Sequence, residues 1–179
     1  RPGFEASKIK GKMGIRASDT AELAFKDTSV PKENLIGEKE GEGFSQIMEL
    51  FNINRVIAAS QGVGVAQGAL DQAIAYVKKR EAFGQPIGKF QVIQFKLAEM
   101  ATMVEAARVL TYKAGWCLDN GRRDHKLIAM AKSLAGEVGV RVTGDALQMH
   151  GGYGFIKDYD IERFYRDAKI VEIYEGTKE

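Results

Sequence analysis

The sequence has 179 residues, which is enough for one domain with a hydrophobic core, or for one domain and part of another. A hydrophobic content of 45%, a charged content of 28% and a net charge of +2 are ordinary for a globular protein and do not indicate binding to nucleic acid or to an anionic membrane. No apolar run is long enough to span a bilayer, and the single cysteine, Cys117, excludes an internal disulfide, so we expect a soluble protein of a reducing compartment.

The first 42 residues are predicted to form a few β-strands followed by a linker. Ile9, Leu23 and Phe25 occupy alternating positions in residues 8–10 and 21–26, which is the period of a half-buried strand. The stretch 37–43 is rich in glycine and glutamate and is typical of a linker. Because two or three strands are too few to be stable alone, we interpret residues 1–42 as the end of a larger β domain and the chain as a C-terminal portion of a longer protein.

From Phe44 onward the apolar residues follow the period of α-helices. We predict helices over residues 44–79, 90–119 and 124–150, and a shorter helix over 161–170. The inner face of the second helix is expected to carry Val92, Phe95, Ala98 or Glu99, Met103 and Ala106. Asp119-Asn120-Gly121 predicts the end of that helix, since asparagine and glycine tolerate the left-handed conformation. The predicted fold is mainly α, with an up-and-down four-helix bundle over residues 43–179.

A carboxylate lies between an aromatic residue and a glycine near the end of the sequence, in Tyr174-Glu175-Gly176. The aromatic ring can help to exclude water from the carboxylate, and glycine allows a backbone N–H to approach a ligand closely. These properties suit a catalytic base. An isolated Tyr-Glu-Gly is more often a solvated loop, so this interpretation depends on the other motifs.

Two further motifs indicate a nucleotide. Arg80 precedes Phe83-Gly84 and Gln91 at the junction of the first and second predicted helices. A guanidinium group offers a fork of donors that matches phosphate oxygens, although an arginine at the C-terminus of a helix also complements the helix dipole. The run 148–154, Gln-Met-His-Gly-Gly-Tyr-Gly, places glycines at a helix end, where a nucleotide can lie against bare backbone and the glutamine can hydrogen-bond to it.

Other patterns do not predict a site. The glycines of residues 62–68 lack the G-x-G-x-x-G spacing and lie inside a predicted helix, so we expect them to allow close helix packing. His125 and His150 have no carboxylate or cysteine at the spacing of metal ligands, and we therefore predict no metal site.

Together the motifs resemble those of the acyl-CoA dehydrogenase family, and the resemblance covers almost the whole sequence. Residues 166–170 and 173–177 are similar to the catalytic segment of that family, and residues 80–84, 90–100 and 148–154 are similar to its flavin-binding segments. Residues 12–18 and 30–37 are similar to the last strands of its middle β domain.

The resemblance implies FAD-dependent α,β-dehydrogenation of an acyl-CoA thioester to the trans-2-enoyl-CoA. Glu175 is then the base that removes the α-proton, while the β-hydrogen leaves as hydride to the flavin. In some branches of the family the base is a glutamate immediately before the arginine that corresponds to Arg55, but here that residue is Asn54, which cannot accept a proton. The resemblance assigns FAD binding to Arg80, Phe83, Gln91, Gln148, Gly151, Gly152, Thr177 and Glu179, and substrate binding to Asn52, Arg55 and Gly176.

The resemblance also implies partners and a location. It implies a homodimer or homotetramer, because the Gln-x-x-Gly-Gly-x-Gly segment of the family holds the adenosine end of FAD across a subunit interface. It implies an electron-transferring flavoprotein as electron acceptor, and the bacterial or archaeal cytoplasm or the mitochondrial matrix as compartment. Two alternatives stay open: a non-catalytic nucleotide-binding or assembly bundle of the same fold, and an acyl-CoA oxidase, in which oxygen reoxidises the flavin.

Overall fold

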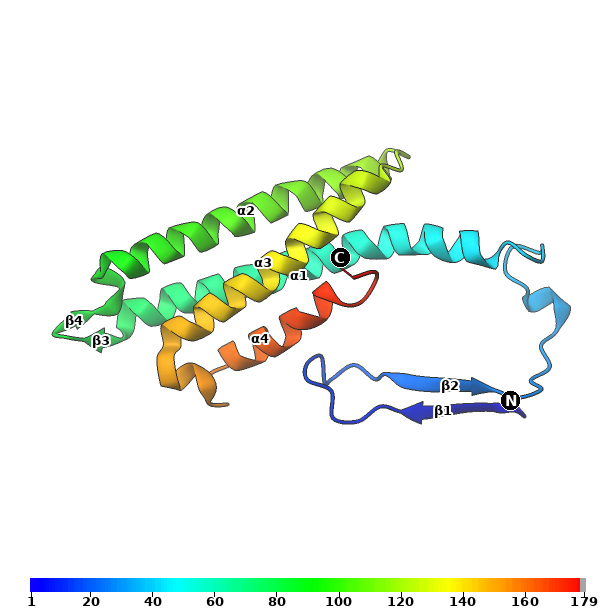
Figure 1. Cartoon of the computed structure of the whole chain (residues 1–179), viewed down its shortest axis with the longest axis horizontal. Helices are drawn as coiled ribbons and strands as arrows, with labels where there is room; N and C mark the ends of the chain where they lie inside the picture. Colours follow the sequence, from blue (N-terminus) through cyan, green and yellow to red (C-terminus); the bar gives the residue numbers. More distant parts are fainter. Residues whose placement is uncertain (178–179) are drawn as a thin grey trace.

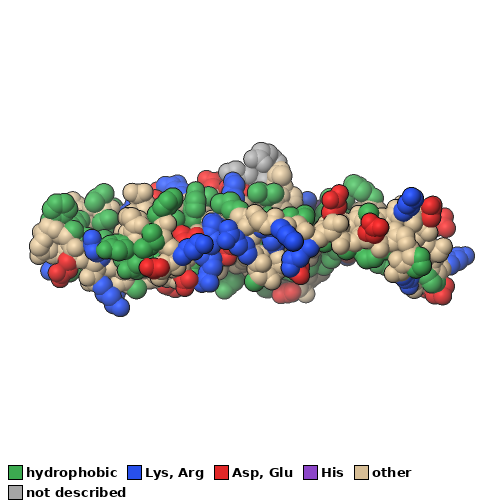
Figure 2. All heavy atoms as spheres, turned by 90° about the horizontal axis from the view of Figure 1, so that it is seen from below, with side chains coloured by type: hydrophobic (Ala, Val, Ile, Leu, Met, Phe, Trp, Pro, Cys, Tyr) green, Lys and Arg blue, Asp and Glu red, His purple; other side chains and the backbone are tan. Residues whose placement is uncertain are grey.

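The computed structural model describes residues 1–177 as an elongated helical bundle with a β-hairpin beside it (Figure 1). Three long helices run up, down and up again, and a short fourth helix lies along them. Within residues 1–177, no helix combines the length and apolar character needed to cross a membrane. The space-filling view from below has hydrophobic side chains along its length and a group of Lys and Arg side chains near its middle (Figure 2). The predicted fold class is therefore confirmed. The elements are β1 (Phe4–Lys8), β2 (Ala21–Phe25), α1 (Gly43–Lys79), β3 (Glu81–Ala82), β4 (Gln85–Pro86), α2 (Gln91–Asp119), α3 (His125–His150) and α4 (Ile161–Ala168).

The helix ends follow from local chemistry and lie close to the predicted positions. At the start of α3, Asp124 Oδ1 accepts a hydrogen bond from the backbone N–H of Leu127 at 2.9 Å, which satisfies one of the donors exposed in the first turn. Gly121 and Gly151, which follow the ends of α2 and α3, have φ values of +68° and +61°. Each end is therefore marked by residues that lie next to it in the sequence, and for this reason it was predictable.

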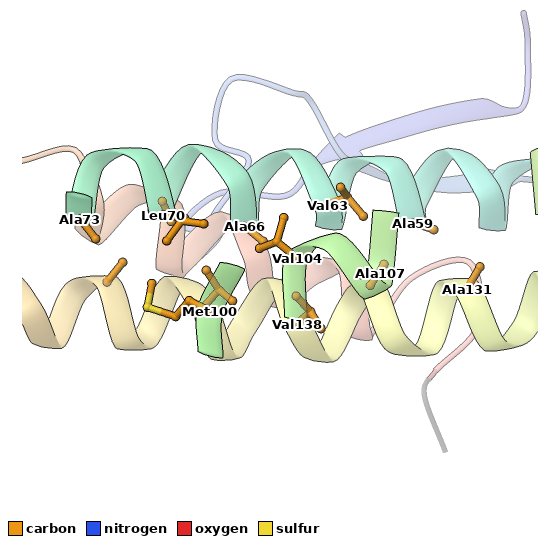
Figure 3. Packing of buried hydrophobic residues seen from close by; sticks show 14 of the residues in the cluster. Ala59, Val63, Ala66, Leu70, Ala73, Met100, Val104, Ala107, Ala131 and Val138 are labelled. Atoms are coloured by element: carbon orange, nitrogen blue, oxygen red, sulfur yellow. The ribbon is translucent and has the colours of Figure 1, made fainter. Parts of the chain in front are cut away.

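The core lies between α1, α2 and α3 and consists largely of alanine and valine side chains (Figure 3). Small side chains allow helix axes to approach closely. At Gly62 a Cβ atom would lie 2.6 Å from the carbonyl oxygen of Ala135, so α1 and α3 touch through backbone at this point. The prediction that glycine allows close packing here is confirmed for Gly62, whereas Gly64 faces open space.

The predicted inner face of the second helix is wrong. Val92 and Phe95 are 70% and 65% exposed, Ala98 and Ala106 are also exposed, and Met103 is half-buried. Apolar residues occur on two sides of α2, and the period alone does not say which side the rest of the chain covers. The side that faces the core carries Met100, Val104, Ala107, Thr111, Ala114 and Cys117.

The β-hairpin touches the bundle mainly through the loop between its strands. β1 pairs antiparallel with β2, with Phe4 opposite Phe25, so the first strand begins and ends earlier than predicted. Both strands are exposed along their length, and the expected half-buried pattern is not formed. In the loop, the backbone N–H of Ile15 donates to Asp167 Oδ1 at 2.7 Å, and Arg166 donates to the carbonyl oxygen of Met13 at 2.8 Å. α1 begins at Gly43, and the division into two domains at that point stays a prediction.

Candidate active site

The chain makes a left-handed turn at Glu175 and Gly176, just after the helical turn Lys169–Glu172. Glu175 has a φ of +55° and Gly176 a φ of +99°. For a residue other than glycine this conformation costs about 1–2 kcal/mol, so other contacts must hold Glu175 in place.

Side chains from two helices hold the backbone of this turn. From α1, Arg55 Nε donates to the carbonyl oxygen of Glu175 at 3.1 Å, and Arg55 Nη1 donates to Asn52 Oδ1 at 3.3 Å. From α3, Lys132 Nζ donates to the carbonyl oxygen of Gly176. Hydrogen bonds from charged donors contribute about 1.5–3 kcal/mol each, enough together to offset the cost of the left-handed turn.

One oxygen of the Glu175 carboxylate is buried and has no hydrogen-bond partner among the described residues. Oε2 is shielded from solvent, and within residues 1–177 no group hydrogen-bonds to it. A buried polar atom left unsatisfied costs free energy, and such atoms are rare in folded proteins. This oxygen is therefore available to accept a proton or a hydrogen bond from a bound molecule.

Tyr174, the residue before Glu175, is half-buried. Its hydroxyl donates to Oε1 of Gln61 on α1. Burial of the ring, together with the negative charge of Glu175, raises the pKa of Tyr174 above its ordinary value, so the phenol stays protonated and donates. Tyr174 and Gln61 line a pocket of about 650 Å³ between the hairpin loop and the end of the chain, with Met13, Ile170 and Ile173 among its other walls.

A second pocket, of about 410 Å³, lies where α1 and α3 end. Arg80, Gly151 and Gly152 all line it, so the structure brings these three predicted flavin contacts together. The guanidinium carbon of Arg80 lies 5.3 Å from the centre of the Tyr153 ring, which holds the cation over the pocket wall. A Cβ atom at Gly151 or Gly152 would meet no atom within 4 Å, so this backbone is open to a ligand.

The sequence profile described as "Acyl-CoA dehydrogenase, C-terminal domain" matches residues 41–179. The chain belongs to the acyl-CoA dehydrogenase family. It is 50% identical over 178 residues to "Acryloyl-CoA reductase (NADH)" of Anaerotignum propionicum and 48% identical over 178 residues to the mitochondrial short-chain specific acyl-CoA dehydrogenase of Bos taurus. The matches cover 99% of this chain but 45% and 43% of those two proteins, so the chain spans less than half of the length of these curated relatives.

Solved structures of the family have the same fold. Butyryl-CoA dehydrogenase from Megasphaera elsdenii superimposes with a TM-score of 0.96 at 46% identity, over 99% of this chain and 46% of that one. A chain in the structure described as "Electron transferring flavoprotein of Acidaminococcus fermentans: Towards a mechanism of flavin-based electron bifurcation" gives a TM-score of 0.96 at 51% identity, over 99% of this chain and 46% of that one.

Among residues 1–177, Arg80, Gly151 and Gly152 are the only predicted site residues that line either of these two pockets. Gln91 and Gln148 are exposed, and Phe83 is 95% exposed on the turn between α1 and α2 with a φ of +54°. Thr177 is exposed, and Glu179 lies outside the described residues. The turn at β3 and β4 lies at one end of the bundle, whereas the C-terminal turn lies midway along α1 (Figure 1). The predicted site residues that the structure describes thus fall into two separate groups.

Sequence reasoning missed two residues that hydrogen-bond to residues 174–176. Gln61 lies on α1 and accepts from Tyr174, and Lys132 lies on α3 and donates to Gly176. A glutamine or a lysine inside an amphipathic helix is usually solvated, and neither belongs to a motif. No signal in the sequence distinguishes them from other polar helix residues.

Proposed function

We propose that the enzyme containing this chain catalyses α,β-dehydrogenation of an acyl-CoA thioester to the trans-2-enoyl-CoA, with FAD as cofactor and Glu175 as the base. The observation that carries the proposal is the carboxylate of Glu175, with a buried oxygen that has no partner among residues 1–177. A left-handed turn presents this carboxylate, and cationic side chains from two helices hold the turn. A fixed carboxylate with one buried oxygen suits a general base, and the family relationship supports the reaction type.

The residues of the turn and those that hold it have different roles at the substrate. An α-proton of a thioester is only weakly acidic, so the negative charge that develops on the thioester oxygen needs hydrogen-bond donors. Within residues 1–177 the backbone N–H of Glu175 has no acceptor, and we assign it to that oxygen. Glu175 removes the α-proton, Gly176 allows close approach of the thioester, and Arg55, supported by Asn52, holds the carbonyl group of Glu175.

The pocket at Arg80 fits part of a dinucleotide. The guanidinium group offers paired donors for a pyrophosphate, and the bare backbone at Gly151 and Gly152 allows close approach of a nucleotide. We assign FAD to this pocket, with Phe83, Gln91, Gln148, Thr177 and Glu179 as the further contacts that the family resemblance implies. When bound, FAD supplies the acceptor for the hydride that leaves the β-carbon.

We also propose a homodimer or homotetramer, in which the Arg80 pocket of one subunit and the Glu175 turn of another serve the same FAD. This explains why one copy of the chain keeps the two groups of residues apart (Figure 1). We propose an electron-transferring flavoprotein as electron acceptor, supported by the similarity to a chain in a structure described as such a flavoprotein.

Replacement of the base tests the proposed function. In the complete flavin-loaded enzyme, Glu175→Gln keeps the shape of the side chain but cannot accept a proton, so we expect bound FAD and no bleaching of its visible absorption by acyl-CoA. Glu137→Gln, at an exposed position on α3, is the matched control and should bleach like the parent enzyme. Because one relative is named as a reductase, reduction of enoyl-CoA is measured as well. Turnover by Glu175→Gln in either direction would contradict the proposal.

A further inference from the structure

Lys132 is a buried lysine behind the Glu175 turn. It lies in α3 and is 3% exposed, and its ammonium group donates to the carbonyl oxygen of Gly176. Lysine is among the residues that are least often fully buried, because removing an ammonium group from water is unfavourable unless hydrogen bonds or charges compensate. A lysine at this position of the core therefore indicates a specific role.

The part of α3 around Lys132 packs directly against residues 171–172, which precede the turn. Gly136 lies one helical turn further on, and a Cβ atom there would be 3.4 Å from the carbonyl oxygen of Val171 and 3.4 Å from Cγ of Glu172. Residues 171–172 are thus packed against α3. The direction of the following turn then depends on the side chains that reach it from α1 and α3.

Two cations hold two consecutive carbonyl groups of this turn. Arg55 from α1 donates to the carbonyl oxygen of Glu175, and Lys132 from α3 donates to that of Gly176. Peptide groups are planar, so fixing both carbonyl oxygens fixes the planes of the two peptides that follow Glu175 and Gly176. These two peptides flank Gly176, so φ and ψ of Gly176 have little freedom. The Cα atom of Glu175 lies in the plane of the first of them, so the point from which the Glu175 side chain projects is held as well.

We propose that Lys132 is a positioning residue for Glu175, a role that rests on the proposed function of Glu175 as base. Lys132 acts through the backbone of Gly176 and does not touch the substrate. Loss of the Lys132 ammonium group leaves the Glu175 carboxylate chemically intact but releases the turn, so the distance and angle between the carboxylate and the α-proton vary more. A catalytic group displaced by about 1 Å can lose about a hundredfold in rate.

Lys132→Met in the complete flavin-loaded enzyme tests the role, because methionine keeps much of the aliphatic chain and removes the ammonium group. We expect kcat to fall about tenfold to a hundredfold, with the KM for acyl-CoA and the flavin content unchanged. The kinetic isotope effect with α-deuterated acyl-CoA should increase, because proton transfer becomes the slower step. Lys132→Arg, which keeps the charge and the donors, should recover part of kcat. Lys126→Met, at an exposed position on the same helix, should behave like the parent enzyme.

Two results would overturn the positioning role. One is a folded Lys132→Met enzyme with the parent kcat and isotope effect; the other is a loss of kcat that only follows a loss of flavin and of folded protein. Lys132→Gln, a shorter neutral donor, replaces the methionine variant for the same measurements if that variant does not fold. The Glu175→Gln variant separates the two proposals: if it still turns over, the proposed base is wrong, whereas an inactive Glu175→Gln beside a fully active Lys132→Met contradicts the positioning role alone.

Discussion

At the scale of single residues, the phenol of Tyr174 links the stability of the site to pH. Burial, and then the charge of Glu175, raise the pKa of Tyr174 above the ordinary value of 10.0. In unfolded chains the phenol loses its proton near the ordinary value, while the folded protein still holds it. The contribution of Tyr174 to the free energy of unfolding is therefore fully present below about pH 10 and is lost as pH rises through the pKa of the folded state.

We expect Tyr174→Phe to remove this part of the alkaline loss. At neutral pH the variant lacks the hydrogen bond to Gln61, and we expect it to be less stable by about 0.5–1.5 kcal/mol. Between about pH 9 and pH 11 its free energy of unfolding should fall less steeply than that of the parent. Urea unfolding at a series of pH values measures both effects. Parallel curves for the two proteins over this range would contradict the assignment.

Some residues of the candidate site could be proposed from the sequence, and others could not. Glu175 could be proposed as the base from the sequence, because the tyrosine and glycine on which that proposal depends are its neighbours in the chain. Lys132 and Gln61 were not, because their partners Gly176 and Tyr174 lie 44 and 113 positions away. A contact between distant residues exists only once the helices have packed.

At the scale of elements, the contact between α1 and α3 depends on the absence of a side chain at Gly62. A Cβ atom there would lie 2.6 Å from the carbonyl oxygen of Ala135, which belongs to the backbone and cannot rotate away. We expect Gly62→Ala to be destabilised by about 1–3 kcal/mol, because the helices must separate. Gly64→Ala, exposed on the same helix with no atom near, should instead gain about 0.5–1 kcal/mol from helix propensity. Urea unfolding of the pair measures this difference, and equal stabilities would contradict it.

An ion pair within α4 makes the contact between α4 and the hairpin loop sensitive to acid. Arg166 donates to both oxygens of Glu162, at 2.6 and 2.9 Å, and also to Met13 in the hairpin loop at 2.8 Å. The hydrogen bond from Arg166 lowers the pKa of Glu162 below its ordinary value of 4.5. Stability from this pair is present above the ordinary value and is lost as pH falls through the folded pKa.

We expect Glu162→Gln to be less stable than the parent at neutral pH by up to about 1 kcal/mol, since both side chains are 21% exposed and screened by solvent. The difference should shrink as pH falls below about 4.5, because the parent then loses its charge as well. Thermal unfolding between about pH 3 and pH 7 measures the difference. A difference in stability between the two proteins that stays constant over this pH range would show that the carboxylate charge contributes nothing to stability.

Predictability differs between elements for a physical reason. The ends of α2 and α3 could be predicted, because Gly121, Asp124 and Gly151 act on the backbone next to them. The inner face of α2 could not, because Val92 and Phe95 are as apolar as Met100 and Val104 on the opposite side. The alanines of the core are no more apolar than the exposed residues of α2, so the hydrophobicity of the sequence does not distinguish the two faces. The packed structure is needed to identify the buried face.

At the scale of the whole molecule, large apolar side chains are left uncovered along two helices. On α2 they include Phe95, Tyr112 and Trp116, which are 65%, 66% and 55% exposed, and on the first part of α1 they include Phe44 and Ile57, which are 78% and 62% exposed. Extended apolar surface on a folded chain marks a contact with another protein surface. These faces are therefore candidates for the contacts of the proposed homodimer or homotetramer.

The proposed assembly is tested on α2, where a charge can be introduced without disturbing the core. Phe95→Glu places a carboxylate on the exposed apolar face, and burying an unpaired charge between subunits is unfavourable, so we expect the variant to have a lower mass by light scattering at low concentration. If FAD is shared between the Arg80 pocket and the Glu175 turn of different subunits, the same variant should lose FAD as it dissociates.

Lys126→Glu, at an exposed polar position on α3, is the control for the change in charge. A folded Phe95→Glu enzyme with the parent mass would remove the α2 face from the interface, and dissociation with full retention of FAD would mean that one subunit holds the cofactor alone.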